Sequence, residues 1–319
     1  VFNPEFNEIA HEKAHVLSEP EEALIARYSE LTQATNDIYS MINNADMKFG
    51  TITDEDGDAV ELTHGSYSRH MESQDRRVRK EAFDTMYTAF EARKNTLAAT
   101  YNYNTKTDAV VAGIRKYRSS LEAALAGDDI PVAVYDNLVA SVRKWLPSLH
   151  RYVELRRKAL RLDAVHMYDI YAPLVQQPAG EIPYEEAVRL VREGLAPLGE
   201  TYGRDLQAGI EAGWIDVYES EGKTSGAYSF GSYDSMPFVL LNYQGRLKDV
   251  FTVAHELGHS MHSYYTRRTQ PFVYGGHSIF TAEVASTVNE NLLMHHLLEK
   301  EIDPDRRRYL LNLYIEEFR

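Results

Sequence analysis

Two histidines four residues apart, with a glutamate directly after the first, stand out in the apolar segment Val253–Met261, V-A-H-E-L-G-H-S-M. On a helix, His255 and His259 share one face, so their imidazoles can bind the same zinc ion. Glu256 lies beside them and can accept a proton from an attacking water molecule. These residue types at this spacing are typical of zinc metallopeptidases, and we predict one zinc ion per chain.

A catalytic zinc site takes a third ligand from the protein. A third histidine at the metzincin spacing is ruled out, because Tyr265 stands where that pattern requires histidine. The first acidic residue after Ser260 is Glu283, which we predict to be the third ligand. Glu290 is two helical turns farther on the same face, and we predict that it orients a ligand histidine by a hydrogen bond. The alternative for both glutamates is a solvent-facing position on a helix.

A second H-E-x-x-H pattern occurs at His11–His15. It carries Lys13 inside the motif, and Pro20 follows soon after it. A charged, hydrated segment is a poor place for a partly dehydrated metal, so we predict that this copy is an exposed helix face.

Three other residues are candidates with weaker support. His262 lies one turn after His259 and can contact the substrate or support a ligand, but a purely structural hydrogen bond is an equal alternative. His277 follows two glycines in a predicted loop and can reach a substrate. Tyr228 can form the wall of a substrate pocket, although ordinary packing explains a single aromatic residue as well.

The elements around these residues are predicted to be mainly helical. Helix-like apolar spacing with few breakers covers Glu21–Asn44, Arg76–Thr100, Lys106–Leu125, Val132–Arg161 and Tyr184–Ala212, and another helix starts at Pro304. We predict a helical scaffold over residues 1–195 and a catalytic, zinc-binding part over residues 196–319.

Two short β structures interrupt the helices. Residues 49–63 read as a hairpin around an acidic turn. A small β-ribbon is predicted from Trp214–Tyr218, Gly226–Gly231 and Phe238–Tyr243, directly before the zinc helix. An exposed strand edge there can hold an extended peptide through backbone hydrogen bonds.

Composition excludes several classes of function. The chain of 319 residues is 26% charged and 44% hydrophobic, as in an ordinary soluble globule. Its net charge of −14 disfavours nucleic-acid and anionic-membrane partners, and no apolar run is long enough to span a membrane. The sequence has no cysteine, which excludes disulfides and thiol catalysis and suits a cytoplasmic location.

Six segments carry a resemblance to a known family: 255–265 (HELGHSMHSYY), 282–286 (AEVAS), 41–46 (MINNAD), 62–65 (LTHG), 225–229 (SGAYS) and 240–243 (LLNY). They resemble oligoendopeptidase F, a branch of the thimet-oligopeptidase family of zinc peptidases. The resemblance implies a large helical clamshell around a deep channel, with zinc at its base. It also implies His255, His259 and Glu283 as ligands and Glu256 as the base.

The same resemblance implies hydrolysis of internal peptide bonds in short unstructured oligopeptides. Members of that family are near twice as long, so we expect this chain to lack N- and C-terminal parts. Two alternatives follow, namely a non-catalytic fragment that binds zinc or peptide, and a zinc exopeptidase.

Overall fold

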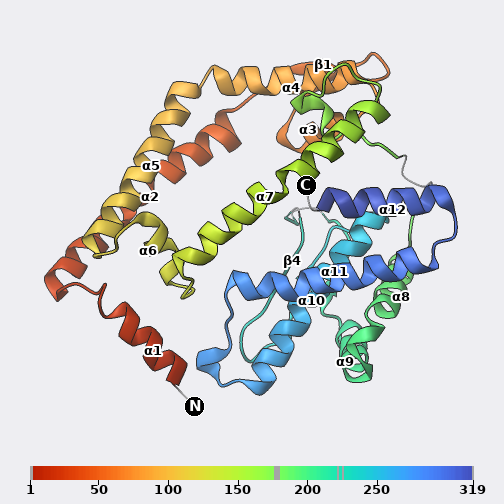
Figure 1. The fold of residues 1–319 in the computed structure, drawn as a ribbon. Coiled ribbons are helices and arrows are strands. Elements are labelled where there is room, and N and C mark those ends of the chain that lie inside the picture. Colours follow the sequence, from red (N-terminus) through yellow and green to blue (C-terminus); the bar gives the residue numbers. More distant parts are fainter. Residues whose placement is uncertain (1–2, 176–179, 221–222, 225, 318–319) are drawn as a thin grey trace. The chain divides into compact units, whose positions relative to one another are not determined.

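A computed structural model describes residues 3–175, 180–220, 223–224 and 226–317. Most of these residues are helical, which confirms the predicted mainly α fold with small β-sheets (Figure 1). The chain forms two compact units, Val1–Leu174 and Val175–Arg319. The predicted boundary between scaffold and catalytic part, at residues 195/196, stays a prediction, as does the channel. The boundary between the two compact units lies earlier, so residues 175–195 belong to the second unit.

The first unit contains α1 (Asn3–Glu12), α2 (Glu19–Ser40), the π-helical turn η1 (Met41–Asp46), β1 (Thr51–Thr53), β2 (Ala59–Glu61), α3 (His64–Met71), α4 (Arg76–Glu91), α5 (Lys94–Ile114), α6 (Ser120–Ala126), α7 (Val132–Ala159) and the 3₁₀ turn η2 (Met167–Asp169). The second contains α8 (Tyr184–Gly194), η3 (Ala196–Leu198), α9 (Glu200–Glu211), β3 (Ile215–Asp216), β4 (Tyr228–Phe230), β5 (Phe238–Leu240), α10 (Leu247–Thr269), η4 (Phe272–Tyr274), α11 (Ile279–Lys300) and α12 (Pro304–Glu317).

For three segments, the prediction of one continuous helix was wrong. The segment predicted as one helix over Arg76–Thr100 is divided between α4 and α5 at residues 92–93. The segment Lys106–Leu125 breaks after α5, where Lys116 adopts a left-handed conformation with φ 64°. Tyr184–Ala212 is divided into α8 and α9 by the 3₁₀ turn η3, and Gly199, with φ 95°, separates this turn from α9.

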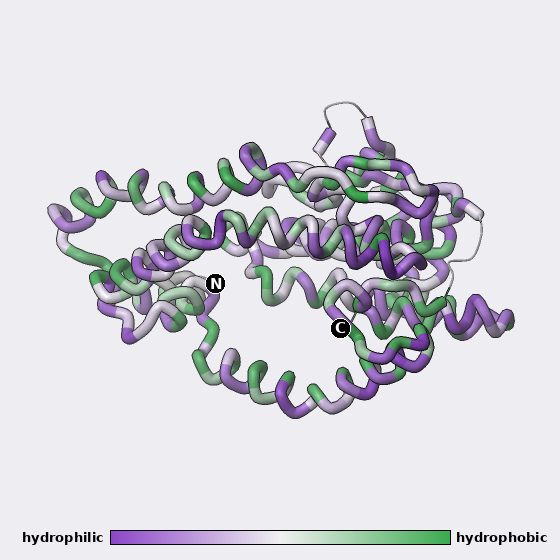
Figure 2. The backbone as a smooth tube through the Cα atoms, turned by 90° about the horizontal axis from the view of Figure 1, so that it is seen from above, coloured by the Kyte–Doolittle hydropathy of each residue, from purple (hydrophilic) through white to green (hydrophobic). Residues whose placement is uncertain are grey.

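The hydropathy of the long helices alternates along their length. In Figure 2 hydrophobic and hydrophilic turns follow one another on each long helix. Among the described residues, no helix combines the length and the apolar composition needed to cross a membrane.

Both predicted β structures are present. Strands β1 and β2 pair antiparallel with Ile52 opposite Val60, as predicted for a hairpin. The second sheet has the order β3-β5-β4, in which β3 is parallel and β4 antiparallel to β5. Strand β4 is therefore an edge strand, and it precedes the zinc-helix candidate α10 in the chain.

The core of the second unit surrounds α10. Val250, Val253, Leu257 and Met261 are buried on that helix, about one turn apart. They pack in one cluster with residues of α8, α11 and the sheet, including Val191, Leu293, Trp214 and Val239. Because α10 is covered on several sides, the side chains of its remaining face are held in fixed positions.

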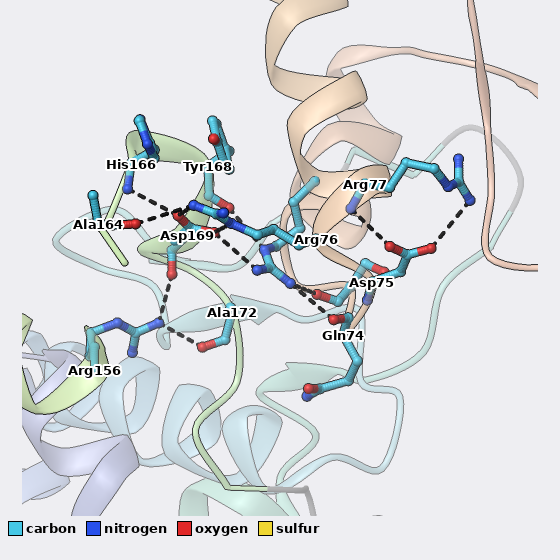
Figure 3. Close-up of polar contacts among 12 residues, drawn as sticks. Gln74, Asp75, Arg76, Arg77, Arg156, Ala164, His166, Tyr168, Asp169 and Ala172 are labelled. Atoms are coloured by element: carbon cyan, nitrogen blue, oxygen red, sulfur yellow. Dashed lines mark hydrogen bonds and ion pairs between the residues drawn. The ribbon is translucent and has the colours of Figure 1, made fainter. Parts of the chain in front are cut away.

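A buried charge cluster stabilises the first unit. Both carboxylate oxygens of Asp169 accept hydrogen bonds from Arg76, and Oδ1 also accepts one from Arg79, at 2.9–3.0 Å. In Figure 3 the Asp169 carboxylate points toward Arg76, and its backbone carbonyl faces Arg156, which also donates to the Ala172 carbonyl. Asp169 and Arg156 are almost fully buried. The cluster thus ties the end of the first unit to the start of α4 and to α7.

Candidate metal centre

The two histidines of the second H-E-x-x-H motif face each other on α10. The Nε2 atoms of His255 and His259 lie 3.1 Å apart, and the two rings meet edge to face with centroids 4.7 Å apart. Their spacing of four residues places them one turn apart on the same face, as the sequence predicts.

Helix α11 brings Glu283 to this pair. Its Oε2 atom lies 3.5 Å from Nε2 of His255 and 3.7 Å from Nε2 of His259. In a tetrahedral zinc site with ligand distances of about 2.0–2.2 Å, ligand atoms are separated by roughly 3.3–3.6 Å. The three atoms therefore form a triangle of nearly the size that a zinc ion requires.

A glycine allows the two helices to approach this closely. A Cβ atom on Gly258 would lie 2.7 Å from Cα of Ser286 and 2.8 Å from the carbonyl oxygen of Ala285. Any side chain there would push α11 away from α10. Gly258 lies inside the motif itself, so this close contact between the helices is at the level of the ligand candidates.

His255 has a second polar contact that orients its ring. Nδ1 of His255 donates to Oε1 of Glu290 at 2.9 Å, and this hydrogen bond is the main cause that raises the pKa of His255. Burial, followed by the neighbouring His255, lowers the pKa of His259, against a hydrogen bond with the backbone of Ala282. Glu290 thus lies where the sequence predicts an orienting carboxylate.

Glu256 is placed beside the ligand candidates and is almost fully buried, with 6% of its surface exposed. Its Oε2 atom is buried and has no hydrogen-bond partner among the described residues. Burial raises the pKa of Glu256, and the neighbouring His255 opposes this shift. A buried carboxylate with a raised pKa is a candidate proton acceptor.

Comparison with known proteins places the chain in a family. The model of peptidase family M3 matches residues 69–319, and a model described as oligopeptidase F matches residues 1–49. The chain belongs to peptidase family M3. The predicted resemblance to oligoendopeptidase F is confirmed at the level of the family.

The matches between this M3 chain and its relatives cover nearly its whole length. Oligopeptidase PepF of Bacillus subtilis (strain 168) is 48% identical over 319 residues, covering 100% of the chain and 48% of the relative. An oligoendopeptidase F homolog of Lactococcus lactis subsp. lactis (strain IL1403) is 44% identical over 98% of the chain and 52% of the relative. The crystal structure of oligoendopeptidase-F from Enterococcus faecium superposes with a TM-score of 0.75 at 38% identity, over 99% of this chain and 50% of that one. The chain spans about half the length of these relatives.

Two polar residues near the ligand candidates were missed by sequence reasoning. The hydroxyl of Ser286, fully buried on α11, donates to Oε2 of Glu283 at 2.8 Å. The amide of buried Asn289 donates to the carbonyl of Ala254 at 3.0 Å and shares a hydrogen bond with Tyr202. Both lie on the side of α11 that faces α10, and their spacing from Glu283 identifies them only once the two helices are placed together.

The three weaker candidates lie in different positions. His262 and His277 stack with ring centroids 4.1 Å apart, and burial lowers the pKa of both. The neighbouring His262 and His259 lower the pKa of His277 further. Tyr228 lies on β4 opposite Leu240 and is about half exposed. In the described ranges, no hydrogen bond or ring contact joins Tyr228 to the three ligand candidates.

The first H-E-x-x-H copy does not form a similar pair. Helix α1 ends at Glu12, so His11 and His15 do not share a helical face. His15 hydrogen-bonds the carbonyl of Arg115 at 2.8 Å and stacks on Tyr117, while exposed His11 lies 3.7 Å from Asp129.

Proposed function

We propose that this chain carries the zinc site of a metalloendopeptidase that hydrolyses internal bonds of short, unstructured oligopeptides. The observation that carries the proposal is the convergence of Nε2 of His255, Nε2 of His259 and Oε2 of Glu283 within one small cluster. Membership in peptidase family M3 and the names of the relatives, oligopeptidase and oligoendopeptidase, support the peptide substrate.

The donor set fits zinc. Two imidazoles and one carboxylate are a common ligand set of catalytic zinc sites, which keep a fourth position open. Zinc in such a site polarises a carbonyl group and lowers the pKa of water. His255 is suited to bind zinc. Its Nδ1–H donates to Glu290, so the proton is on Nδ1 and the lone pair on Nε2 is available for the metal.

Glu256 is proposed as the catalytic base. Its carboxylate would accept the proton of the attacking water and later pass it to the leaving amine nitrogen. Burial raises the pKa of Glu256, which makes its carboxylate a stronger base toward the proton of the water.

Strand β4 is proposed to hold the substrate backbone. It is the edge of the sheet, and Ser229 on β4 hydrogen-bonds Ser260 on α10 at 2.8 Å, so the edge lies beside the zinc helix. An extended peptide added to this edge is bound through its main chain, which suits many sequences. Tyr228 and His277 are proposed to contact substrate side chains, with His262 supporting His277 by stacking. A cytoplasmic location is part of the proposal.

The test uses the complete protein that contains this chain. Glu256→Gln is expected to keep zinc and to lose peptide hydrolysis by about 10²–10⁴-fold, because the amide cannot accept a proton. Glu283→Ala is expected to weaken zinc binding strongly as well, because only the two histidine ligands remain. Near-normal turnover of Glu256→Gln would remove Glu256 from the mechanism.

The products of hydrolysis separate the alternatives. Mass spectrometry of a peptide library is expected to show internal cuts in short peptides and none in folded proteins. Stepwise release of terminal residues would instead indicate an exopeptidase. Zinc bound by an inactive complete protein would indicate a module that only binds zinc or peptide.

A further inference from the structure

Two of the three ligand candidates are each held by one additional polar contact. Glu290 holds His255 through a hydrogen bond at Nδ1. Ser286 makes the corresponding contact with Glu283, and it donates to Oε2, the same oxygen that faces both histidines.

We propose that Ser286 is a positioning residue that holds the Glu283 carboxylate ready for the metal. This inference rests on the proposed function, because it assigns Ser286 a role toward the same zinc ion. Ser286 does not contact the metal or the substrate in this proposal. It acts only through the carboxylate of Glu283.

Glu283 needs such a contact more than the two histidines do. Its side chain is 48% exposed, whereas those of His255 and His259 are 26% and 18% exposed. An exposed glutamate side chain samples many rotamers and loses that freedom when it binds a metal. A hydrogen bond that selects the correct rotamer in advance reduces this loss and raises the affinity for zinc.

Ser286 is a rigid anchor for this purpose. It is fully buried, and its Cα lies where the backbone of α11 comes closest to Gly258 of α10. The hydroxyl therefore has a fixed position relative to the helix that carries the histidines.

A purely structural role is the alternative, because the Ser286 hydroxyl also lies 3.0 Å from the backbone carbonyl of Glu283. Serines within helices often make this bond to the preceding turn. The carboxylate is the shorter contact, at 2.8 Å, and bonds to a charged acceptor are stronger. Thr287 provides the matched comparison, since its hydroxyl bonds only to the carbonyl of Glu283 in the described structure.

The experiment compares Ser286→Ala with Thr287→Val in the complete protein. The zinc dissociation constant is measured by competition with a chelator, and the melting temperature is measured on the metal-free protein. Ser286→Ala is expected to raise the dissociation constant by about 10–100-fold, as for other residues that orient a metal ligand. Thr287→Val is expected to change it by less than about threefold, because an exposed hydroxyl contributes little.

A double-mutant cycle adds a second readout. If Ser286 acts through the Glu283 carboxylate, Ser286→Ala should have no further effect on zinc affinity in a Glu283→Ala background. Equal and additive losses in both backgrounds would overturn the inference. So would an unfolded Ser286→Ala protein, or a lower metal-free melting temperature with unchanged zinc affinity. Failure of the unmodified protein to bind zinc would refute the proposed function instead.

Discussion

Gly258 on α10 lies against the backbone of Ser286 on α11, so closely that a Cβ atom at position 258 would be 2.7 Å from the Cα of Ser286. The contact sets the distance between the two helices at the level of the ligand candidates. Since Glu283 is less than one turn before Ser286, the same contact sets how far the carboxylate lies from the histidines.

Gly258→Ala is therefore expected to weaken both folding and metal binding. Overpacking of this kind typically costs about 1–3 kcal/mol of the free energy of unfolding. The displaced α11 should also lower zinc affinity. Urea unfolding and zinc titration measure the two effects. Gly203→Ala on α9 is the control, because a Cβ there meets no atom within 4 Å; the same result for both variants would contradict the role of the close contact.

Glu290→Gln should reduce zinc affinity without abolishing binding. The amide oxygen can still accept from Nδ1 of His255 but carries no charge, so it polarises the imidazole less. A loss of about tenfold in zinc affinity is expected, measured by chelator competition. Complete loss of zinc would indicate that Glu290 is itself a ligand. An unchanged zinc affinity would indicate that Glu290 is only a surface charge.

The double variant His11→Ala, His15→Ala should keep its zinc content. Neither histidine faces the other, and His15 is already bonded to the carbonyl of Arg115. Elemental analysis of the purified protein gives the number of zinc ions per chain. Loss of the metal from a folded double variant would move the zinc site to the N-terminal motif.

Asp169→Asn is expected to destabilise the first unit by about 3–5 kcal/mol, because it leaves the buried guanidinium group of Arg79 without its counter-charge. Asp163→Asn, in the same loop but exposed, should change the free energy of unfolding by less than about 0.5 kcal/mol. Denaturant unfolding near neutral pH compares the two.

The effect of Asp169 should also depend on pH. Burial raises the pKa of Asp169, but hydrogen bonds from Arg76, the backbone of His166 and Arg79 outweigh it and bring the pKa below the ordinary 3.8. A group whose pKa is lower in the folded state stabilises the protein above its unfolded pKa and loses this contribution as the pH falls. The stability difference between the unmodified protein and Asp169→Asn should therefore be constant above about pH 5 and shrink below about pH 4. A difference that grows on acidification would contradict the depressed pKa.

The parts of the site that follow from local periodicity were predictable. A spacing of four residues fixes His255 and His259 on one face, and a spacing of seven puts Glu290 on the same side of its helix as Glu283. The ribbon was predictable from its β-rich segments, although its strand order, with β5 in the centre, was not.

The parts that depend on contact between helices were not predictable. Nothing in the sequence around Gly258 states which backbone lies against it, and Ser286 and Asn289 read as ordinary helix residues until α10 is placed beside them. The break at residues 92–93 has no proline or glycine to mark it, so helical propensity alone extended α4 too far.

The three ligand candidates all lie within residues 255–283, on two successive helices. Closing a loop costs more entropy as the loop lengthens, so a site built from adjacent helices requires little closure entropy. During synthesis, all three ligand candidates are available once α11 has emerged from the ribosome. Zinc capture can thus accompany the pairing of two neighbouring helices, and the nascent chain need not bring together distant parts of its sequence first.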